Sequence, residues 1–372
     1  MIRSMEDGFA GRNRKKLPVA DVFKDLYWHI KSGILFARGL MGKPDATFDF
    51  NIETLVSTLN ELEKHIAHPL YPFVATWNQR LWDLAGKNFE EIRAFREAVL
   101  AALQGWILVE GLEKNAAYFS GLKEFRRSLE QPLRIFSLNY DRCVECLEGN
   151  GDAQFRVEQG FGTEETNPER IWNWRRMQSD LAGRDNVELR NTDIFLYKLH
   201  GSIDWIRDEN EQLKLIEPTE IRNFPMRDIE IIFGKEAKLD ARDPFSFYFS
   251  EFRRACKTAS VVVAIGYSFA DPHVNQILAG ALQEPKSHAT LVVVTRPPTE
   301  PCRESDDDQK NLIAKRLAGE QTDANRKRWD KLVAQIKNRI HVRAVGAEAF
   351  LRDTVSWKQL SEYLPKSDDP FA

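Results

Sequence analysis

Apolar residues recur every three to four positions through the first third of the chain. Val22, Leu26 and Ile30 follow this spacing, and similar stretches continue beyond them. Because such a repeat places its side chains on one face of a helix, we predict a mostly helical region over residues 19–130. Residues 1–18 are polar and basic, and we predict a flexible arm there.

The pattern changes at Pro132, after which short apolar runs alternate with helical segments. Continuous apolar runs rich in β-branched residues are typical of strands buried on both faces of a parallel sheet. They cover residues 133–138, 194–199, 260–265, 290–295 and 340–345. Strands separated by helices indicate an α/β fold. We therefore predict a Rossmann-like parallel sheet in residues 131–372, with the large, mostly helical region attached to it.

Three segments of the second part have a different pattern. Residues 150–190 are rich in glycine, asparagine and charge, and we predict a loop with a short helix there. Residues 203–216 alternate around a polar turn, which predicts a hairpin. Residues 306–337 are charged and are predicted to form one solvated helix.

Three of the predicted strands are followed at once by polar or small residues. These are Asn139-Tyr140-Asp141, His200-Gly201-Ser202, and Gly266-Tyr267-Ser268 with Asp271 close behind. Ligands bind beyond the carboxyl ends of strands in open parallel sheets, so we expect these groups to converge on one edge. Taken singly, each has a structural interpretation: a cap at Asp141, a buried hydrogen-bonded histidine, a sharp turn at Gly266.

Composition narrows the range of ligands and locations. Lys and Arg number 53 against 56 Asp and Glu, so the net charge of -3 does not indicate nucleic acid. No apolar run approaches the roughly 20 residues of a membrane span, and we expect a cytoplasmic protein. Cys143 and Cys146 have the spacing of half a zinc site, but no second pair follows. We expect these cysteines to be packing residues and no metal to be bound.

The blocks FSLNYD, LYKLHGSIDW and VVVAIGYSFADPHVNQIL resemble the three hallmark blocks of bacterial sirtuin-like proteins. Proteins of this family act as NAD⁺ hydrolases in antiphage defence, often with a partner that senses infection. The resemblance covers roughly residues 130–300 and implies that residues 131–372 form an NAD-binding core. It implies no metal, with NAD⁺ as the substrate.

The resemblance also assigns roles to individual residues. Asn139 matches the catalytic asparagine, which would hold the attacking water or the ribose, and His200 matches the catalytic histidine, which would act as general base. Asp141 would orient the nicotinamide or its ribose. The remaining NAD⁺ contacts implied are Gly201, Ser202, Gly266, Ser268 and Asp271.

One expected block is not found in this sequence. Members of the family normally begin with a strand and a Gly-Ala-Gly-Ala-Ser-type loop that cradles the pyrophosphate. Gly8-Phe9-Ala10-Gly11 is a poor substitute, because no apolar strand precedes it. Two explanations stay open: the strand lies upstream, or phosphate binding is reduced or achieved differently.

Four functions remain compatible with the sequence. The leading hypothesis is an NAD⁺ glycohydrolase that releases nicotinamide and ADP-ribose and depletes NAD⁺ in antiphage defence. The alternatives are an NAD-dependent protein deacylase, a weak or inactive scaffold that binds a nucleotide or a partner protein, and a metallo-phosphoesterase built on Asn139, Asp141 and His200. We also expect a homo-oligomer, and a sensor or ATPase as partner.

Overall fold

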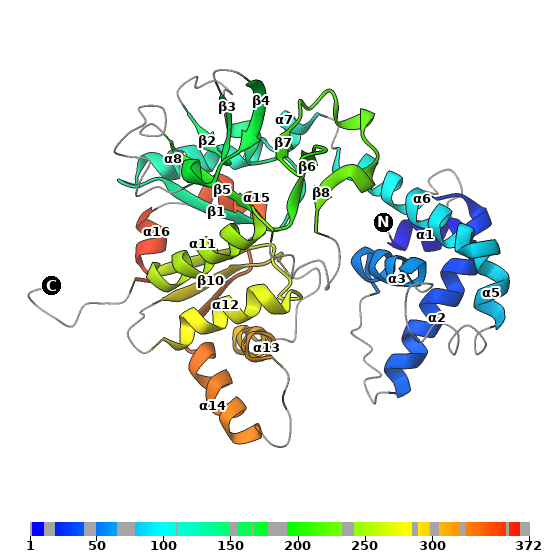
Figure 1. Cartoon of the computed structure of the whole chain (residues 1–372). Helices are drawn as coiled ribbons and strands as arrows, with labels where there is room; N and C mark the ends of the chain where they lie inside the picture. Colours follow the sequence, from blue (N-terminus) through cyan, green and yellow to red (C-terminus); the bar gives the residue numbers. More distant parts are fainter. Residues whose placement is uncertain are drawn as a thin grey trace, which may run out of the picture.

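The structure is a computed structural model of the chain (Figure 1). It describes most of the 372 residues. The described ranges are 2–10, 19–40, 50–64, 79–108, 111–148, 155–164, 167–177, 192–232, 242–284, 289–297, 305–319, 321, 325–354 and 357–364.

The first third of the chain is helical in the described residues, as its spacing predicted. The longer helices are α2 (Lys24–Leu40), α3 (Ile52–Lys64) and α6 (Glu90–Ile107). Their apolar faces meet in one cluster that includes Tyr27, Leu55 and Phe95, each fully buried. The shorter helical elements are η2 (Asp21–Phe23), α5 (Gln79–Ala85), η4 (Lys87–Phe89), α7 (Leu112–Asn115), η5 (Ala117–Ser120) and α8 (Gly121–Arg127).

The start of the chain differs from the predicted flexible arm. Residues Ile2–Phe9 form helix α1, whose Met5 and Phe9 are buried in the helical cluster. These two side chains lie one turn apart, and burying them stabilises a helix that the polar composition alone does not predict. Gly8 and Phe9 therefore end a helix and do not form a loop after a strand. Residues 11–18 of the predicted arm lie outside the described residues.

The parallel strands form two three-stranded sheets. In the first, β1 (Leu133–Ser137) pairs with β5 (Ile194–Lys198), which pairs with β2 (Val157–Glu158). In the second, β9 (Val261–Ile265) and β11 (Ile340–Arg343) flank β10 (Thr290–Val294). All these pairs are parallel, and the predicted α/β, Rossmann-like class with its large helical region is confirmed.

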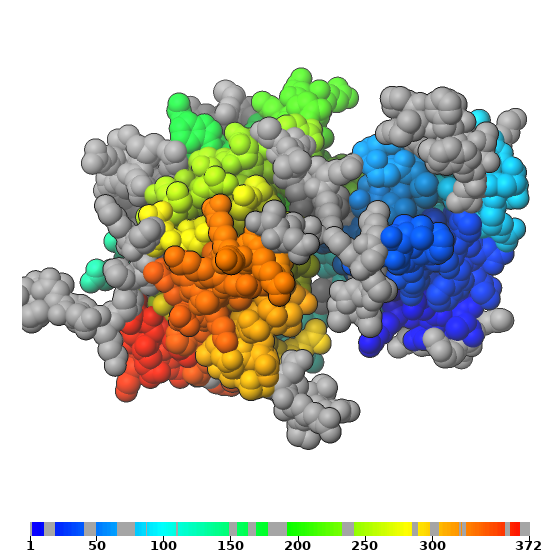
Figure 2. Space-filling model, turned by 90° about the horizontal axis from the view of Figure 1, so that it is seen from below, coloured from blue at the N-terminus to red at the C-terminus, as the bar shows by residue number. Residues whose placement is uncertain are grey.

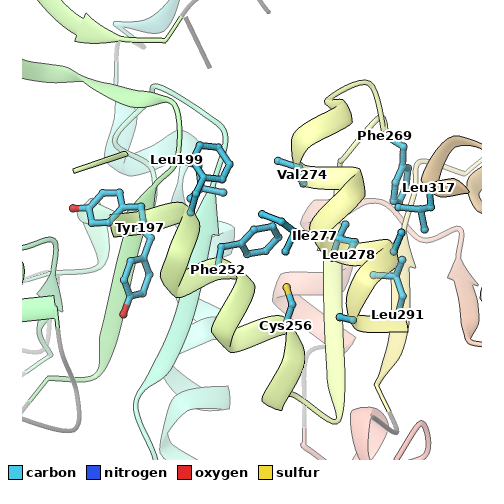
Figure 3. Close-up of a cluster of buried hydrophobic side chains, with 14 of the residues drawn as sticks. Tyr197, Leu199, Phe252, Cys256, Phe269, Val274, Ile277, Leu278, Leu291 and Leu317 are labelled. Carbon is cyan, nitrogen blue, oxygen red and sulfur yellow. The ribbon is translucent and has the colours of Figure 1, made fainter. Parts of the chain in front are cut away.

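Two clusters of apolar side chains, one on each face, cover both parallel sheets together. One cluster contains Phe195 and Tyr197 of β5 together with Leu291 and Val293 of β10. The opposite cluster contains Leu196 of β5 together with Val294. Since alternate residues of a strand face opposite sides, the two sheets behave as two halves of one layer. The first cluster includes Phe252 of helix α11 (Phe245–Thr258), which lies between the halves (Figure 3).

The inner edges of the two halves are open among the described residues. β1 and β9 are edge strands, and Figure 1 shows β1 on the side nearer the second sheet. Every residue of β1 is only partly buried, whereas every residue of β5 is buried. Likewise β9 is partly buried and its Ile265 is 36% exposed, although its apolar sequence predicted full cover. An apolar strand loses its cover where no neighbour pairs with it, and that accounts for the difference.

A third, antiparallel sheet lies beside the first one. It contains β3 (Phe161–Glu164), β4 (Asn167–Trp172), β7 (Leu213–Leu215), β6 (Gly201–Arg207) and β8 (Ile229–Ile231) in that order. The pairing of β6 with β7 confirms the predicted hairpin. The loop predicted over residues 150–190 is wrong for β2, β3 and β4. β2 and β4 pair with strands distant in the sequence, β3 pairs with β4, and Trp172 packs on Tyr248.

The antiparallel sheet also contacts the helical region. Leu103 of α6 is buried with Ile203 and Ile229, and Gln104 donates hydrogen bonds to the carbonyls of Ile221 and Phe224. The short elements nearby are η7 (Trp174–Met177), η9 (Ile221–Asn223) and η10 (Met226–Asp228). This contact fixes the helical region beside the carboxyl ends of the strands.

The last part of the chain supplies helices that cover the second parallel sheet. α12 (Pro272–Gln283) follows β9, and α13 (Asp306–Ala318) and α14 (Arg326–Lys337) replace the single helix predicted over 306–337. α13 ends at Gly319, whose positive φ of 77° interrupts the helix. The remaining short elements are η6 (Glu145–Leu147), α15 (Ala347–Ala349), η11 (Phe350–Thr354) and α16 (Trp357–Ser361). None of the described helices is long and apolar enough to cross a bilayer.

Candidate functional site

The polar segments after β1, β5 and β9 come together at one end of the parallel sheets. β1 and β5 are in register with Ser137 opposite Lys198, and the amide of Leu199 donates to the carbonyl of Ser137. Continued two residues further, this register brings Asn139 beside His200. The convergence follows from the parallel direction of the strands, and it is the arrangement that the sequence predicted.

His200 and Asp271 form the central contact of the site. The Nε2 atom of His200 lies 3.0 Å from Oδ2 of Asp271, and both side chains are buried. The other carboxylate oxygen of Asp271 accepts the amides of His273 and Val274 at the first turn of α12. Asp271 thus caps the helix and also fixes the histidine ring. This bond joins the end of the first parallel sheet to the end of the second.

Asn139 and Asp141 differ in their surroundings. Asn139 is exposed, and its backbone amide donates to the hydroxyl of Ser137. Asp141 is half-buried, and its carboxylate accepts the amide of Cys143. The side chain of Asn139 therefore faces solvent at the strand ends. Asp141 instead stabilises the local turn through its bond to the amide of Cys143.

The residues after His200 are tightly enclosed by the antiparallel sheet. Ser202 is fully buried, and its hydroxyl lies 3.5 Å from the carbonyl oxygen of Tyr140. Gly201 has a φ of 80°, and a Cβ atom there would overlap the carbonyl oxygen of Glu230. Only glycine fits at this position, so Gly201 sets the close approach of β6 to β8 directly behind His200.

The turn after β9 is open to solvent on one side and strained on the other. Gly266 (φ 64°) and Ser268 are exposed, and nothing lies within 4 Å of a Cβ placed on Gly266. Phe269 has a φ of 57°, which is unusual for a bulky residue, and its side chain is buried. The hydroxyl of Tyr267 holds the turn together, because it lies 2.8 Å from the side-chain oxygen of Asn275 and 3.1 Å from the carbonyl oxygen of Asp271.

A buried ionic network supports the site from behind and was missed in the sequence. The ammonium of Lys198 contacts the carbonyl of Asp141 and lies 3.1 Å from a carboxylate oxygen of Glu145. Burial raises the pKa of the Glu145 carboxyl, against the opposing effect of Lys198. Arg142 forms an ion pair of 2.7 Å with Asp204, which is 1% exposed. The lysine inside the apolar run of residues 194–199 could have revealed this network, because a buried lysine requires a partner.

The helical region borders the same site. Burial, and then the carboxylates of Glu53 and Asp271, raise the pKa of Tyr140. Glu53 belongs to α3, so this helix lies within electrostatic reach of the strand ends. The hydroxyl of Tyr140 donates to the carbonyl of Ile232 and closes this side of the site.

The tight turn behind His200 gives a testable stability prediction. We expect Gly201→Ala to lower the free energy of unfolding by about 2–5 kcal/mol, because a left-handed conformation and a backbone clash both oppose the new methyl group. The matched control Gly266→Ala meets no neighbour and should cost only about 1–2 kcal/mol, for the conformation alone. Denaturant unfolding of both variants measures the difference. Equal losses would contradict the close approach to Glu230.

The described residues offer no group of three or more side chains that could ligate a metal. Cys143 and Cys146 are free thiols, and burial is the first cause that raises the pKa of each. Raised pKa values make thiols poor nucleophiles and poor ligands at neutral pH. Both cysteines are half-buried, and Cys302 lies outside the described residues.

Comparison with known proteins identifies the family. A search of curated proteins gave no significant match. A family model described as a SIR2-like domain matches residues 133–318, which is half of the chain. The match begins with β1, ends with α13 and includes all eight predicted site residues; domains of this type use NAD. The chain belongs to the SIR2-like domain family.

Proposed function

We propose that the protein is an NAD⁺ glycohydrolase. In the proposed reaction, water attacks C1′ of the nicotinamide ribose while the bond to the nicotinamide nitrogen breaks. The products are nicotinamide, ADP-ribose and one proton. The observation that carries the proposal is the buried His200–Asp271 pair, 3.0 Å apart at the strand ends beside Asn139, within a SIR2-like domain.

The roles follow from the hydrogen bonds at these residues. When Nε2 of His200 donates its proton to the Asp271 carboxylate, Nδ1 carries a lone pair and can accept a proton from water or a ribose hydroxyl. The exposed amide of Asn139 can hold that water or the ribose. Gly266, Ser268 and the turn they form would border the adenosine side, and Asp141 and Gly201 would be neighbours of the nicotinamide ribose. Ser202 would act indirectly, because its hydroxyl lies near the carbonyl of Tyr140 and so links the segment after β5 to the segment after β1.

The purified full chain incubated with NAD⁺ tests the proposal. We expect nicotinamide and ADP-ribose to form in equal amounts, which chromatography of the reaction mixture measures. Adding an acetylated peptide should leave the rates of nicotinamide and ADP-ribose formation unchanged. A deacylase would instead require the peptide and would form acetylated ADP-ribose. No nicotinamide release, alone and with proteins co-purified from the native host, would remove the glycohydrolase assignment.

A second candidate function is a scaffold that binds a nucleotide without cleaving it. The open edges of β1 and β9 favour it, because a central strand and its glycine-rich loop are not seen in the described residues. Backbone amides of such a loop usually bind the pyrophosphate. Calorimetry with NAD⁺ and ADP-ribose separates the candidates: binding without turnover supports the scaffold.

We further propose that NAD⁺ cleavage serves antiphage defence, in the cytoplasm and with a sensor or ATPase partner. A homo-oligomer is supported by the apolar side chains that α2 exposes, Leu35, Phe36 and Leu40, since exposed apolar patches mark interfaces. Phage plating efficiency with and without expression of the chain, and mass measurement in solution, test these proposals. Unchanged plating and a monomer would contradict them.

A further inference from the structure

A cavity of about 860 Å³ lies between helices α11, α12 and α13. Its volume is in the range of small-molecule sites. None of the predicted site residues lines it, although Phe269, Ala270 and Pro272, the neighbours of Asp271, form one wall. The cavity therefore adjoins the turn that carries Asp271 but includes none of the predicted site residues.

The walls of this cavity are positively charged. Arg253 and Lys257 project from α11, one helical turn apart, and Lys315 and Arg316 project from the last turn of α13. No Asp or Glu is found among the described residues that line it. Arg253, Lys257 and Lys315 form no ion pair or hydrogen bond with described residues. All four residues are exposed, and four like charges around one hollow favour the binding of an anion.

The floor of the cavity is apolar and lacks a side chain at one point. Phe269, Ile277 and Leu317 are buried and border it, and Figure 3 shows Phe269 and Leu317 next to each other beside α12. At Gly280 a Cβ atom would meet nothing within 4 Å. The floor can accept a flat apolar group, while the cationic walls can bind negative charge on the ligand. A ligand with both parts therefore fits better than a bare anion. Figure 2 shows α13 and α14, in orange, on this face.

Hydrogen bonds connect the cavity to the proposed reaction site. Arg316 donates to the carbonyl of Ser268, and Asn275 donates to the carbonyls of Phe269 and Arg316. The carbonyls of Ser268 and Phe269 belong to the turn that ends at Asp271, the partner of His200. A phosphate held by Arg316 would compete with the Ser268 carbonyl for the guanidinium and alter the turn.

We propose that this cavity is a second ligand site, which binds a nucleoside phosphate and regulates the strand-end site through Arg316 and the turn at Ser268. The phosphates lie between the cations of α11 and α13, and the base lies on the floor around Gly280. The binding part stands on the cavity alone, whereas the regulatory part rests on the proposed glycohydrolase function.

The binding test uses ADP, inorganic pyrophosphate and adenosine as probes, measured by calorimetry on the full chain. ADP is expected to bind at least tenfold more tightly than pyrophosphate or adenosine, and less tightly at higher salt. The double variant Arg253→Gln, Lys257→Gln should weaken ADP binding at least tenfold. The matched variant Lys24→Gln, Lys331→Gln removes two exposed charges outside the cavity and should leave binding unchanged.

A third variant tests the contribution of the apolar floor to binding separately from that of the charged walls. Gly280→Met fills the floor without changing charge and improves the helix propensity of this position. It should weaken ADP binding at least tenfold and leave pyrophosphate binding unchanged. ADP binding that survives both cavity variants, or pyrophosphate binding as tight as ADP, overturns the proposal of a nucleoside phosphate site.

Regulation has its own measurement. ADP should change amide hydrogen exchange of the turn at residues 266–271, and Arg316→Gln should abolish that change. If NAD⁺ is cleaved, ADP should also change the rate at least twofold in the wild type and not in Gly280→Met. Unchanged exchange on ADP binding overturns the regulatory part, while absence of NAD⁺ cleavage with intact ADP binding counts against the glycohydrolase alone.

Discussion

Replacing His200 with alanine is expected to lower the rate of nicotinamide release by about 10²–10⁴-fold, the range that a general acid–base group contributes. His200 is the ring whose Nε2 lies 3.0 Å from Asp271 at the converged strand ends. Asn139→Ala should cause a comparable loss, and since Asn139 is exposed, its removal should leave the unfolding midpoint nearly unchanged. Single-turnover assays with NAD⁺ measure both losses.

His273→Ala is the matched control for this experiment. His273 also lies near the start of α12, but its ring packs on Phe249 and not on Asp271. Its loss should leave turnover within a few-fold of the wild type. If His200→Ala retained most of the activity while folding normally, His200 would be a structural residue and the proposed mechanism would fail.

Lys198→Met is expected to lower the free energy of unfolding by about 3–5 kcal/mol, because it leaves the buried carboxylate of Glu145 without its partner. Lys198 is 1% exposed and lies 3.1 Å from Glu145. Burial raises the pKa of Glu145, so the folded variant binds a proton more readily than the unfolded chain. Its stability should therefore fall as the pH rises through that raised pKa, and the loss should be smallest in acid.

Denaturant unfolding at several pH values measures this effect. The double variant Lys198→Met, Glu145→Leu replaces both charges by apolar groups and should recover most of the lost stability. Arg170→Met breaks an exposed pair with Glu217 and should cost only about 0–1 kcal/mol. A loss in Lys198→Met no larger than in Arg170→Met would contradict a buried, paired Glu145.

The parts of the site that were predictable are those encoded by local signals. The apolar runs before Asn139, His200 and Gly266 each specify a buried strand and its end. Because parallel strands end at a common edge, three local predictions together gave the convergence of the site. No knowledge of distant contacts was needed for that step.

The parts that were missed depend on residues distant in sequence. β4 pairs with β7 across more than 40 residues, and nothing within its own sequence distinguishes it from a loop. Helix α1 depends on burial of Met5 against helices that come later in the chain. The partner of Lys198, Glu145, is 53 residues away, so the apolar run could reveal a buried charge but not its counter-ion.

The open edges of β1 and β9 have a mechanical consequence. Among the described residues, no ladder of backbone hydrogen bonds links the two parallel sheets, which are held in line by α11 and by side chains packed on both faces. Side-chain packing resists sliding less stiffly than a strand ladder does. The bond between His200 and Asp271 spans this seam, so any relative sliding of the two halves lengthens or shortens that contact and changes the orientation of the imidazole.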